Sequence, residues 1–502
     1  MKKTILILMV ITGLSKILGF IRELLLAFFY GATDLTDIYF ISLTIPETIY
    51  AFFGIALSTS LIPLYSELKE KHPIEVQNKF INNVLSFIFL SSILLIIFVW
   101  IFTPQIVKLF AFGFTGTTFE LAVLFTRITI ISIYFRGVLY VFKGYLQVNN
   151  SFVFAEFTGL FFNLIMIIII PLSYIYGFIF LPIGFIVGRL IQVMIIYPFT
   201  KKEGFKYIFY INKNDQFFGR MIVLAVPGIF GISINQINIL IDRTLASQIL
   251  SGGISALTYA EKINLLVHGV VVITIATVIY STMSKQAAKQ DFEGLKNTLI
   301  ESINMIIILI IPLSLLFMTQ AQTIISVIYG RGAFEQDAIQ LTSVALFFYT
   351  IGLIGIALRE ILTRAFFSVQ DSRTPTINAS ISMIINIILN VILSKYLGIG
   401  GLALATSISA IIGSILLLYS FRNKVVKLNV NNSLIVLFKV ISSSLVSIFL
   451  STIILNQLTI SNIYMSLLFF TIFFGTLYLI LIKYMKVREI ELIWEIILNK
   501  IR

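Results

Sequence analysis

The chain contains no cysteine among its 502 residues, and charged residues make up only 12% of it. The lack of cysteine excludes disulfides, thiolate catalysis and cysteine-ligated metal sites. The scarcity of charge, together with 58% hydrophobic residues and a mean hydropathy of +1.01, excludes a soluble globular protein of this length. Long polar segments are also missing, so we expect no extramembrane domain that could carry out soluble catalysis.

Apolar runs of about 20 residues, long enough to cross a bilayer as a helix, recur from one end of the chain to the other. They do not alternate polar and apolar residues as barrel strands do, and backbone hydrogen bonding in lipid then requires helices. We therefore predict an all-α polytopic membrane protein with fourteen transmembrane helices. The predicted spans are residues 4–30, 37–65, 82–103, 119–146, 152–173, 177–199, 218–249, 256–283, 299–318, 339–367, 375–395, 400–421, 433–455 and 462–484.

Lysine and arginine are unevenly distributed over the connections between these spans. Twenty-three lie at the chain ends and in alternate connections, whereas the other connections hold only Lys108, Arg331 and Lys395. The positive-inside rule then places both termini in the cytoplasm and requires an even number of spans, which fourteen satisfies. A net charge of +13 would indicate nucleic acid in a soluble protein, but here the informative property is where the charges lie, and we expect no nucleic-acid partner.

Three turns recur at a spacing of 220 to 222 residues, which makes spans 1–6 and 7–12 two copies of one unit, related as parallel repeats. We predict two pseudo-symmetric six-helix lobes, residues 1–210 and 211–425, followed by two C-terminal helices and a cytoplasmic tail, residues 426–502. Matched lobes facing a central cavity suit alternating access. The alternative is chance matching in a biased composition. The paired turns are Tyr30-Gly31 with Ser251-Gly252, Asn149-Asn150-Ser151 with Asp371-Ser372-Arg373, and Tyr176-Gly177 with Leu397-Gly398.

The first apolar span contains three charged residues, Lys16, Arg22 and Glu23. A charge at the bilayer centre costs about 2.5–3.5 kcal/mol on insertion scales, so it normally faces a bundle interior or a watery cavity. Lys16 and Glu23 share a helix face, which allows a purely structural ion pair, whereas Arg22 lies on another face unless the helix bends near Gly19. Together with Lys262 in the eighth span, these basic residues predict a cavity that attracts an anion; the alternative is a structural role for each.

Two other arginines lie near the predicted cytoplasmic ends of their spans, Arg136 and Arg364. A long basic side chain in that position can extend its charge to the membrane interface, and we expect this for both. Glu360 precedes Arg364 by four residues and can pair with it on one helix face.

A second polar group comprises Asp242 in span 7, Asn386 and Asn390 in span 11, and Thr406 in span 12. These side chains offer hard oxygen ligands in apolar surroundings, and hard cations prefer such ligands. They predict a site for a coupling cation such as sodium. The alternative is hydrogen bonding between helices, which is common for asparagine and threonine in membranes.

Several motifs resemble those of the MurJ-type lipid II flippases, the mouse-virulence-factor family of the MOP exporter superfamily. In the first lobe they are S-K-I-L-G-F-I-R-E, D-L-T-D-I-Y-F-I and I-P-L-Y-S-E. In the second lobe they are Q-I-N-I-L-I-D, G-G-I-S-A-L-T-Y-A-E-K-I, Y-G-R-G-A-F at 329–334, R-A-F-F-S-V-Q-D-S-R-T-P at 364–375 and G-I-G-G-L-A-L-A-T-S-I-S-A at 398–410. The resemblance extends over roughly residues 10 to 420 in matching order.

The resemblance implies a fourteen-helix bundle with a V-shaped central cavity. Such a protein moves the undecaprenyl-pyrophosphate-linked peptidoglycan precursor, lipid II, from the inner to the outer leaflet of the bacterial plasma membrane. It implies substrate-binding roles for the basic residues Lys16, Arg22 and Lys262 and matches Glu23 and Asp37 to acidic positions. We therefore expect a monomeric transporter that is not an enzyme, whose partners are the lipid-linked precursor and membrane lipids.

The chain departs from the family pattern on the second helix, where Tyr50, Ala51 and Ile55 replace a basic pair and an acidic residue. The resemblance also maps the family's sodium site to Asp242, Asn386, Asn390, Thr406 and the backbone of Leu402. Asn390 stands where an aspartate is often found, which predicts a weaker site for Na⁺. No covalent cofactor is expected.

Two other functions fit the same architecture: export of another polyprenyl-linked oligosaccharide, and MATE-like antiport of drugs or cations. A drug exporter should favour acidic cavity residues, and the lysines of the first and eighth helices argue against it. A membrane-embedded glycosyltransferase or polymerase would need paired acids at a surface loop, and we find none in the sequence.

Overall fold

The computed structural model describes residues 2–428, 431–458 and 460–490, with the side chains of residues 2–6, 53, 55–59 and 226–234 left out. All regular secondary structure in these ranges is helical. The described chain divides into two compact units. Unit 1 extends to Ser255 and includes Arg331–Phe334, and unit 2 comprises Ala256–Gly330 and the chain from Glu335 onward.

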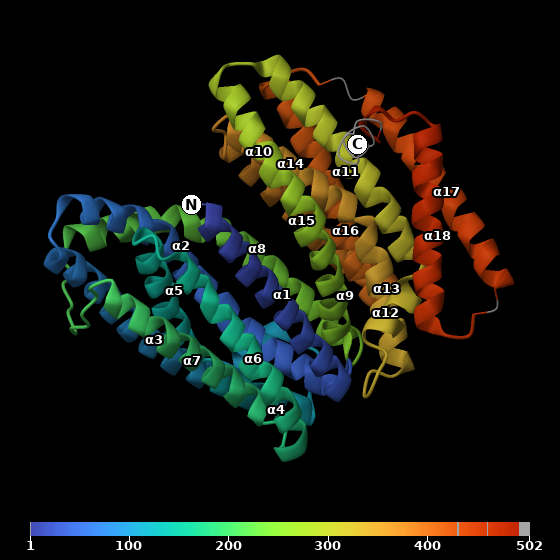
Figure 1. Cartoon of the computed structure of the whole chain (residues 1–502). Coiled ribbons are helices and arrows are strands. Elements are labelled where there is room, and N and C mark those ends of the chain that lie inside the picture. The colour runs from blue at the N-terminus through green and yellow to red at the C-terminus, as the bar shows by residue number, and fades with distance from the viewer. Residues whose placement is uncertain (1, 429–430, 459, 491–502) are drawn as a thin grey trace. The chain divides into compact units, whose positions relative to one another are not determined.

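Unit 1 contains eight long helices, shown from blue to green in Figure 1. They are α1 (Lys2–Tyr30), α2 (Asp34–Lys71), α3 (Ile74–Phe110), α4 (Gly116–Thr129), α5 (Ser132–Val148), α6 (Phe152–Tyr176), α7 (Phe180–Lys202) and α8 (Gln216–Ile249). Helix α2 packs against α4, α5 and α8, and α6 packs against α1 and α7. The α1–α2 turn is tight because Gly31 has a φ of +64° and its carbonyl accepts a hydrogen bond of 2.9 Å from the Thr36 hydroxyl. This turn brings the charged parts of α1 and α2 into one unit.

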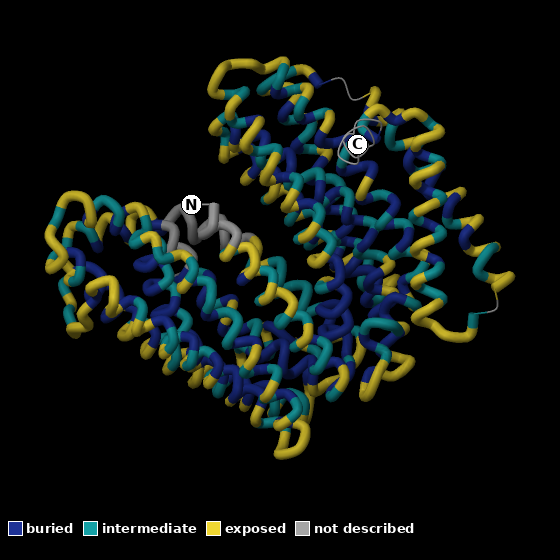
Figure 2. The backbone as a smooth tube through the Cα atoms, viewed as in Figure 1, coloured by how far each residue is buried: buried dark blue, intermediate teal, exposed yellow. Residues whose placement is uncertain are grey.

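Unit 2 is built around α16, against which α13, α14 and α15 pack, while α17 packs against α11 and α18. Its elements are α9 (Gly253–Val267), which begins in unit 1, the π-helical segment η1 (His268–Val272), α10 (Ile273–Ala288), α11 (Phe292–Thr319), α12 (Ala321–Ile328), α13 (Gln336–Ile351), α14 (Leu353–Ser368), α15 (Arg373–Leu397), α16 (Ile399–Lys424), α17 (Asn431–Gln457) and α18 (Ile463–Tyr484). In both units the buried residues lie on the helix faces that pack together (Figure 2).

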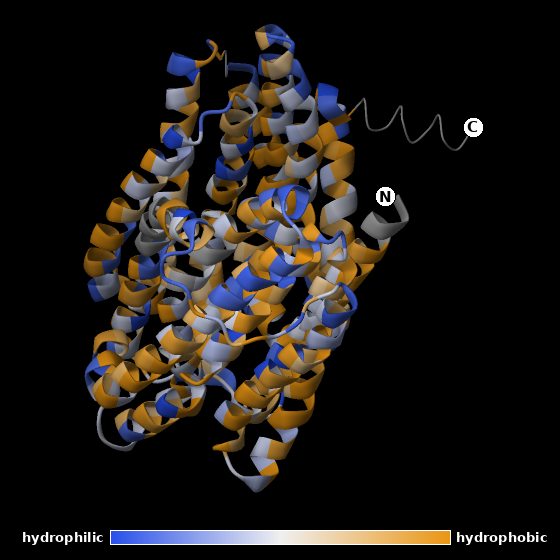
Figure 3. Ribbon diagram, turned by 90° about the vertical axis from the view of Figure 1, so that its left-hand side faces the viewer, coloured by the Kyte–Doolittle hydropathy of each residue, from blue (hydrophilic) through white to orange (hydrophobic). Residues whose placement is uncertain are grey.

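Twelve of the fourteen predicted spans lie within one helix or within consecutive helices, and the other two begin shortly before their helices, at residue 177 before α7 and at residue 462 before α18. By length and composition, ten helices in the described part of the chain can cross a membrane, or eleven if α13 and α14, bent by 43°, form one span. The all-helical, multi-pass class is confirmed and is evident from the apolar helices and polar connections in Figure 3. The exact count of fourteen stays a prediction.

The turns that the sequence pairs share an unusual backbone conformation. A residue with positive φ occurs in both members of two pairs, Gly31 with Gly252 and Gly177 with Gly398. In the third pair, Asn150 has a positive φ in the first turn, and Gln370, directly before Asp371, has one at the start of the second. The break between α4 and α5 likewise has a counterpart between α13 and α14. Unit 1 nevertheless contains α8, which the repeat assigns to the second lobe. The lobe boundaries therefore stay predictions, because a sequence repeat and a packing unit are different properties.

Helices α14 and α16 approach closely at Gly355. A Cβ atom there would lie 2.5 Å from the Ile411 nitrogen and 2.7 Å from the Ala410 carbonyl carbon, both of which are backbone atoms. We expect Gly355→Ala to lower the free energy of unfolding by about 1–3 kcal/mol, because the helices must separate to admit the methyl group. Thermal unfolding of the purified protein measures this change. The matched control is Gly475→Ala in α18, where no atom lies within 4 Å of the added Cβ; equal melting temperatures for the two variants would contradict the prediction.

Candidate functional site

The contact between α1 and α6 positions the first charged group of the site. The helices lie close at Gly159, where a Cβ atom would be 3.0 Å from the Ser15 hydroxyl. At this separation the Asn163 amide of α6 donates a 2.9 Å hydrogen bond to the Ser15 carbonyl. The amide oxygen of Asn163 is then free to accept a 3.1 Å hydrogen bond from the Arg22 guanidinium. Small residues on α6 thus allow Arg22 to be fixed from a second helix.

Arg22 also pairs with the residue that follows it. Its Nη2 lies 2.7 Å from Oε1 of Glu23, and the exposed fractions of the two side chains are 24% and 7%. The predicted alternative, a pair between Lys16 and Glu23, is not formed: Lys16 is exposed and makes no ion pair with any residue that the structure describes. Glu23 therefore neutralises Arg22, while the charge of Lys16 remains uncompensated.

Glu47 of α2 holds two further arginines. Its Oε1 lies 2.9 Å from Nη1 of Arg136 in α5 and 3.6 Å from Nη2 of Arg189 in α7. The extension of Arg136 to the membrane interface stays a prediction, and in the structure its guanidinium pairs with Glu47. Sequence analysis missed Glu47 and Arg189, although both carry the signal used for α1, an ionisable residue inside an apolar span.

Aromatic rings also surround these arginines, and one ring lies near both the Arg22–Glu23 pair and one of the arginines held by Glu47. The Arg189 guanidinium lies 4.3 Å from the centre of the Phe162 ring, and the Arg22 guanidinium lies 5.7 Å from the same ring. We call the five charged residues Arg22, Glu23, Glu47, Arg136 and Arg189 the cationic cluster. Three guanidinium groups and two carboxylates leave it with a net charge of +1. The planar, always charged guanidinium suits carboxylate and phosphate oxygens, so this part of unit 1 is suited to an oxyanion.

Asp37 has a different environment from the other predicted site residues. Its carboxylate is buried and accepts hydrogen bonds of 2.7 Å from both the backbone nitrogen and the hydroxyl of Ser255, and one of 3.4 Å from the Ile254 nitrogen. These donors belong to the first turn of α9, whose backbone N–H groups have no partner within the helix. Asp37 therefore stabilises a helix N-terminus, and its contact with substrate stays a prediction.

The other predicted residues are divided between the two units. Lys262 is half-buried in α9 of unit 2, and Asp242 lies in unit 1, where it accepts a 3.4 Å hydrogen bond from the Asn238 amide. The remaining four, all in unit 2, do lie together on α15 and α16. Asn390 donates to Asn386 (2.9 Å), Asn386 donates to Thr406 (3.4 Å), and Thr406 donates to the Leu402 carbonyl (3.1 Å).

This chain of two buried amides and one half-buried hydroxyl contains oxygen atoms suited to a hard cation, but its hydrogen bonds are equally those of helix packing. No group of three His, Cys, Asp or Glu residues that could hold a metal occurs in the described ranges. Binding of Na⁺ stays a prediction.

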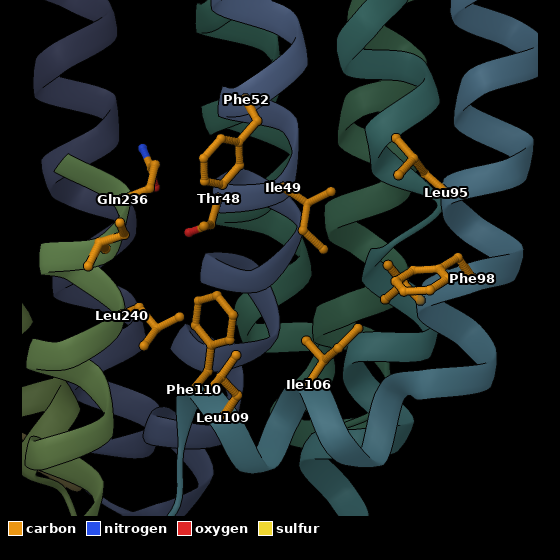
Figure 4. Close-up of a pocket in the computed structure, with 12 residues that line it drawn as sticks. Thr48, Ile49, Phe52, Leu95, Phe98, Ile106, Leu109, Phe110, Gln236 and Leu240 are labelled. Atoms are coloured by element: carbon orange, nitrogen blue, oxygen red, sulfur yellow. The ribbon is translucent and has the colours of Figure 1, made fainter. Parts of the chain in front are cut away.

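An apolar cavity of about 260 Å³ lies beside the cluster in unit 1, between α2, α3 and α8 (Figure 4). Phe52, Phe110 and Leu240 are among its lining residues, and although Thr48 and Gln236 also line it, the surface that the described residues present to it is apolar. Such a lining favours hydrocarbon and excludes a charged headgroup. Within unit 1, the cationic cluster and the apolar cavity are therefore separate sites.

Comparison with known proteins now identifies the family. The profile of the lipid II flippase MurJ family matches residues 26–478. The chain belongs to the MurJ family. The predicted resemblance is thereby confirmed, and the chain is a member of a transporter family and a multi-pass membrane protein.

Individual MurJ relatives cover most of the chain. The lipid II flippase MurJ of Thermosipho africanus (strain TCF52B) is 31% identical over 436 residues, which cover 86% of this chain and 88% of the relative. The probable lipid II flippase MurJ of Buchnera aphidicola subsp. Baizongia pistaciae is 28% identical over 423 residues, covering 83% and 82%.

Solved structures agree with this assignment. A lipid II flippase MurJ in an inward closed conformation superposes with a TM-score of 0.80 and 29% identity, covering 95% of this chain and 98% of the other. An inward-facing multidrug resistance MATE family transporter has a TM-score of 0.67 at 14% identity, covering 82% and 94%. The second likeness shows that this chain and that transporter share a fold, and nothing more.

Proposed function

We propose that this chain translocates lipid II from the inner to the outer leaflet of the bacterial plasma membrane by alternating access. Membership of the MurJ family supports this function. The structural observation that carries it is the cationic cluster, in which three arginines outnumber two glutamates among apolar helices. A pyrophosphate headgroup cannot cross hydrocarbon without replacement of its hydration, and fixed guanidinium groups supply that replacement while the lipid tail stays in the bilayer.

In this proposal Lys16, Arg22 and Lys262 attract and hold the anionic headgroup, with Glu23 and Asp37 as the acidic residues of the site. The exposure of Lys16 and the partial exposure of Arg22 support such contacts. We further propose that both termini lie in the cytoplasm, that the protein acts as a monomer without enzymatic activity, and that it binds no nucleic acid. The bias of basic residues over alternate connections supports the orientation.

Complementation in a bacterial host tests the function. The resident lipid II flippase is depleted, this chain is expressed, and growth and cell-wall synthesis are measured. We expect rescue, whereas failure despite good membrane expression would exclude lipid II as the substrate. Transport of another polyprenyl-linked oligosaccharide would then become the leading candidate. The net positive charge of the cluster disfavours a MATE-like exporter of cationic drugs.

We also propose that Na⁺ binds at Asp242, Asn386, Asn390, Thr406 and the Leu402 carbonyl and is coupled to transport. The hydrogen-bonded proximity of the last four supports this. Replacing Na⁺ by K⁺ in a vesicle assay should slow flipping several-fold, because the larger ion fits an oxygen site of fixed size less well. Asn390→Asp should strengthen the Na⁺ dependence by adding a charge. An identical rate in both ions would leave these residues with packing roles only.

A further inference from the structure

The shared glutamate of the cationic cluster is more exposed than the arginines that it joins. The exposed fraction is 45% for the Glu47 side chain, 22% for Arg136 and 14% for Arg189. Of the three groups, the carboxylate is therefore the one that can rotate away from its partners without unpacking a helix. The guanidinium groups, in contrast, are held in place.

Packing fixes the two arginines independently of Glu47. Arg189 donates a 3.0 Å hydrogen bond to Gln192 and lies against the rings of Phe162 and Phe185, 4.3 and 5.0 Å from their centres. Arg136 lies 5.4 Å from the centre of the Tyr50 ring. If Glu47 rotated away, these contacts would keep the two guanidinium groups facing one another, so the arrangement is preorganised for an anion.

Hydrogen-bonding capacity in this arrangement is not fully used. The Nε of Arg189 is buried and has no hydrogen-bond partner among the described residues. Oε1 of Glu47 is the nearest carboxylate oxygen to both arginines, and its distance to Arg189 is the longer one, 3.6 Å. A buried donor without a partner is costly, so this position is suited to a further acceptor oxygen.

We propose that Arg136 and Arg189 form an oxyanion subsite, which Glu47 occupies in the structure and leaves when a substrate carboxylate or phosphate binds. The proposal rests on the proposed function, since lipid II carries both kinds of group. Glu47 acts as an internal counter-ion that keeps two half-buried arginines paired in the absence of substrate. Glu47 also keeps the headgroup from binding too tightly, because its carboxylate is tethered nearby and can replace the headgroup when it leaves.

Glu47→Gln tests the exchange, because glutamine keeps the shape of the side chain and removes the competing charge. We expect the Kd of lipid II, measured with the full chain in nanodiscs, to fall about tenfold, the scale of one charge-assisted hydrogen bond. A purely structural ion pair predicts a lower melting temperature with an unchanged or higher Kd, and this result would overturn the proposal. Glu47→Asp, which withdraws the carboxylate and keeps its charge, should lower Kd by a smaller factor.

The matched control is Glu156→Gln. Glu156 pairs with Lys143 at 3.5 Å, and its exposed fraction of 43% is close to that of Glu47, but it holds one cation instead of two. We expect no change in Kd for this variant. Arg189→Gln should raise Kd about tenfold, and in the double variant Glu47→Gln/Arg189→Gln the gain from Glu47→Gln should be lost.

To find which group of the substrate supplies the oxyanion, we compare the Kd of lipid II with the Kd of a form of it from which the peptide has been removed. If Glu47→Gln tightens binding of both lipids equally, the subsite takes a phosphate, and if the gain requires the peptide, it takes a carboxylate. No gain with either lipid would overturn the subsite. Flipping by the wild-type chain is measured in parallel, so that absence of flipping together with tighter binding would reject the proposed function and retain the subsite.

Discussion

Reversing the charge of Arg22 is expected to abolish lipid II translocation. Arg22→Glu removes the hydrogen bond to Asn163, the pair with Glu23 and the only fixed guanidinium of α1. Loss of one charge-assisted contact to the headgroup alone costs about 1.5–3 kcal/mol, and the introduced repulsion adds to it. We therefore expect flipping at least about 100-fold slower in reconstituted vesicles and no complementation of a depleted host.

The structure also shows how to separate transport from folding in this variant. Arg22→Glu leaves two adjacent carboxylates, one of which is buried, and breaking a buried pair costs about 3–5 kcal/mol. The exchanged variant Arg22→Glu/Glu23→Arg keeps an ion pair in the same place and should recover membrane levels. Because the guanidinium then starts from a different helix face, we expect transport to remain lost. Wild-type flipping by the exchanged variant would remove Arg22 from the substrate site.

Removing the Asp37 carboxylate is expected to produce the largest loss of stability. Asp37→Ala removes the acceptor of two backbone N–H groups of α9 in a buried position, whereas the Ser255 hydroxyl can still donate to the Gly252 carbonyl at 3.0 Å. Each orphaned donor costs about 1–3 kcal/mol, so we expect the free energy of unfolding to fall by about 3 kcal/mol or more. Thermal unfolding and the yield of folded protein in membranes measure this loss.

Asp37→Asn is the informative companion variant, because it retains Oδ1, which accepts both hydrogen bonds from Ser255. It should be much less destabilised than Asp37→Ala. If Asp37 only caps α9, flipping by the asparagine variant will follow its folded amount. Loss of flipping at an unchanged melting temperature would instead assign Asp37 to the substrate, as the family resemblance implies.

Sequence analysis predicted well what depends on local composition. The helices follow from long apolar runs, and the special position of Arg22 follows from its charge within one of them. The association of Asn386, Asn390 and Thr406 was also predictable, since the first two are four residues apart and a short turn returns α16 along α15. Each of these depends on neighbours close in the chain.

What sequence analysis missed depends on which helices are neighbours. Glu47, Arg136 and Arg189 come from three helices whose order in space no periodicity reveals. The start of α3 shows the same limit. The predicted span begins at residue 82, but α3 begins at Ile74. The polar first part of the helix packs on the connection after α7, where the Asn82 and Asn83 amides donate to the backbone carbonyls of Lys206 and Asn212. A hydropathy profile shows where the apolar span ends, but it does not predict that the helix continues into the polar segment.

The paired turns and the cationic cluster together reveal an asymmetry between the repeats. At the common spacing of 221 residues, Arg136 corresponds to Ala357 and Arg189 to Ala410, and both alanines are buried. In the predicted repeat the turns keep their backbone conformation, while only the first copy holds guanidinium groups at these two positions. In the predicted repeat, this part of the first copy therefore carries charged groups, whereas the equivalent part of the second has buried alanines and packs closely, as at Gly355 against Ala410.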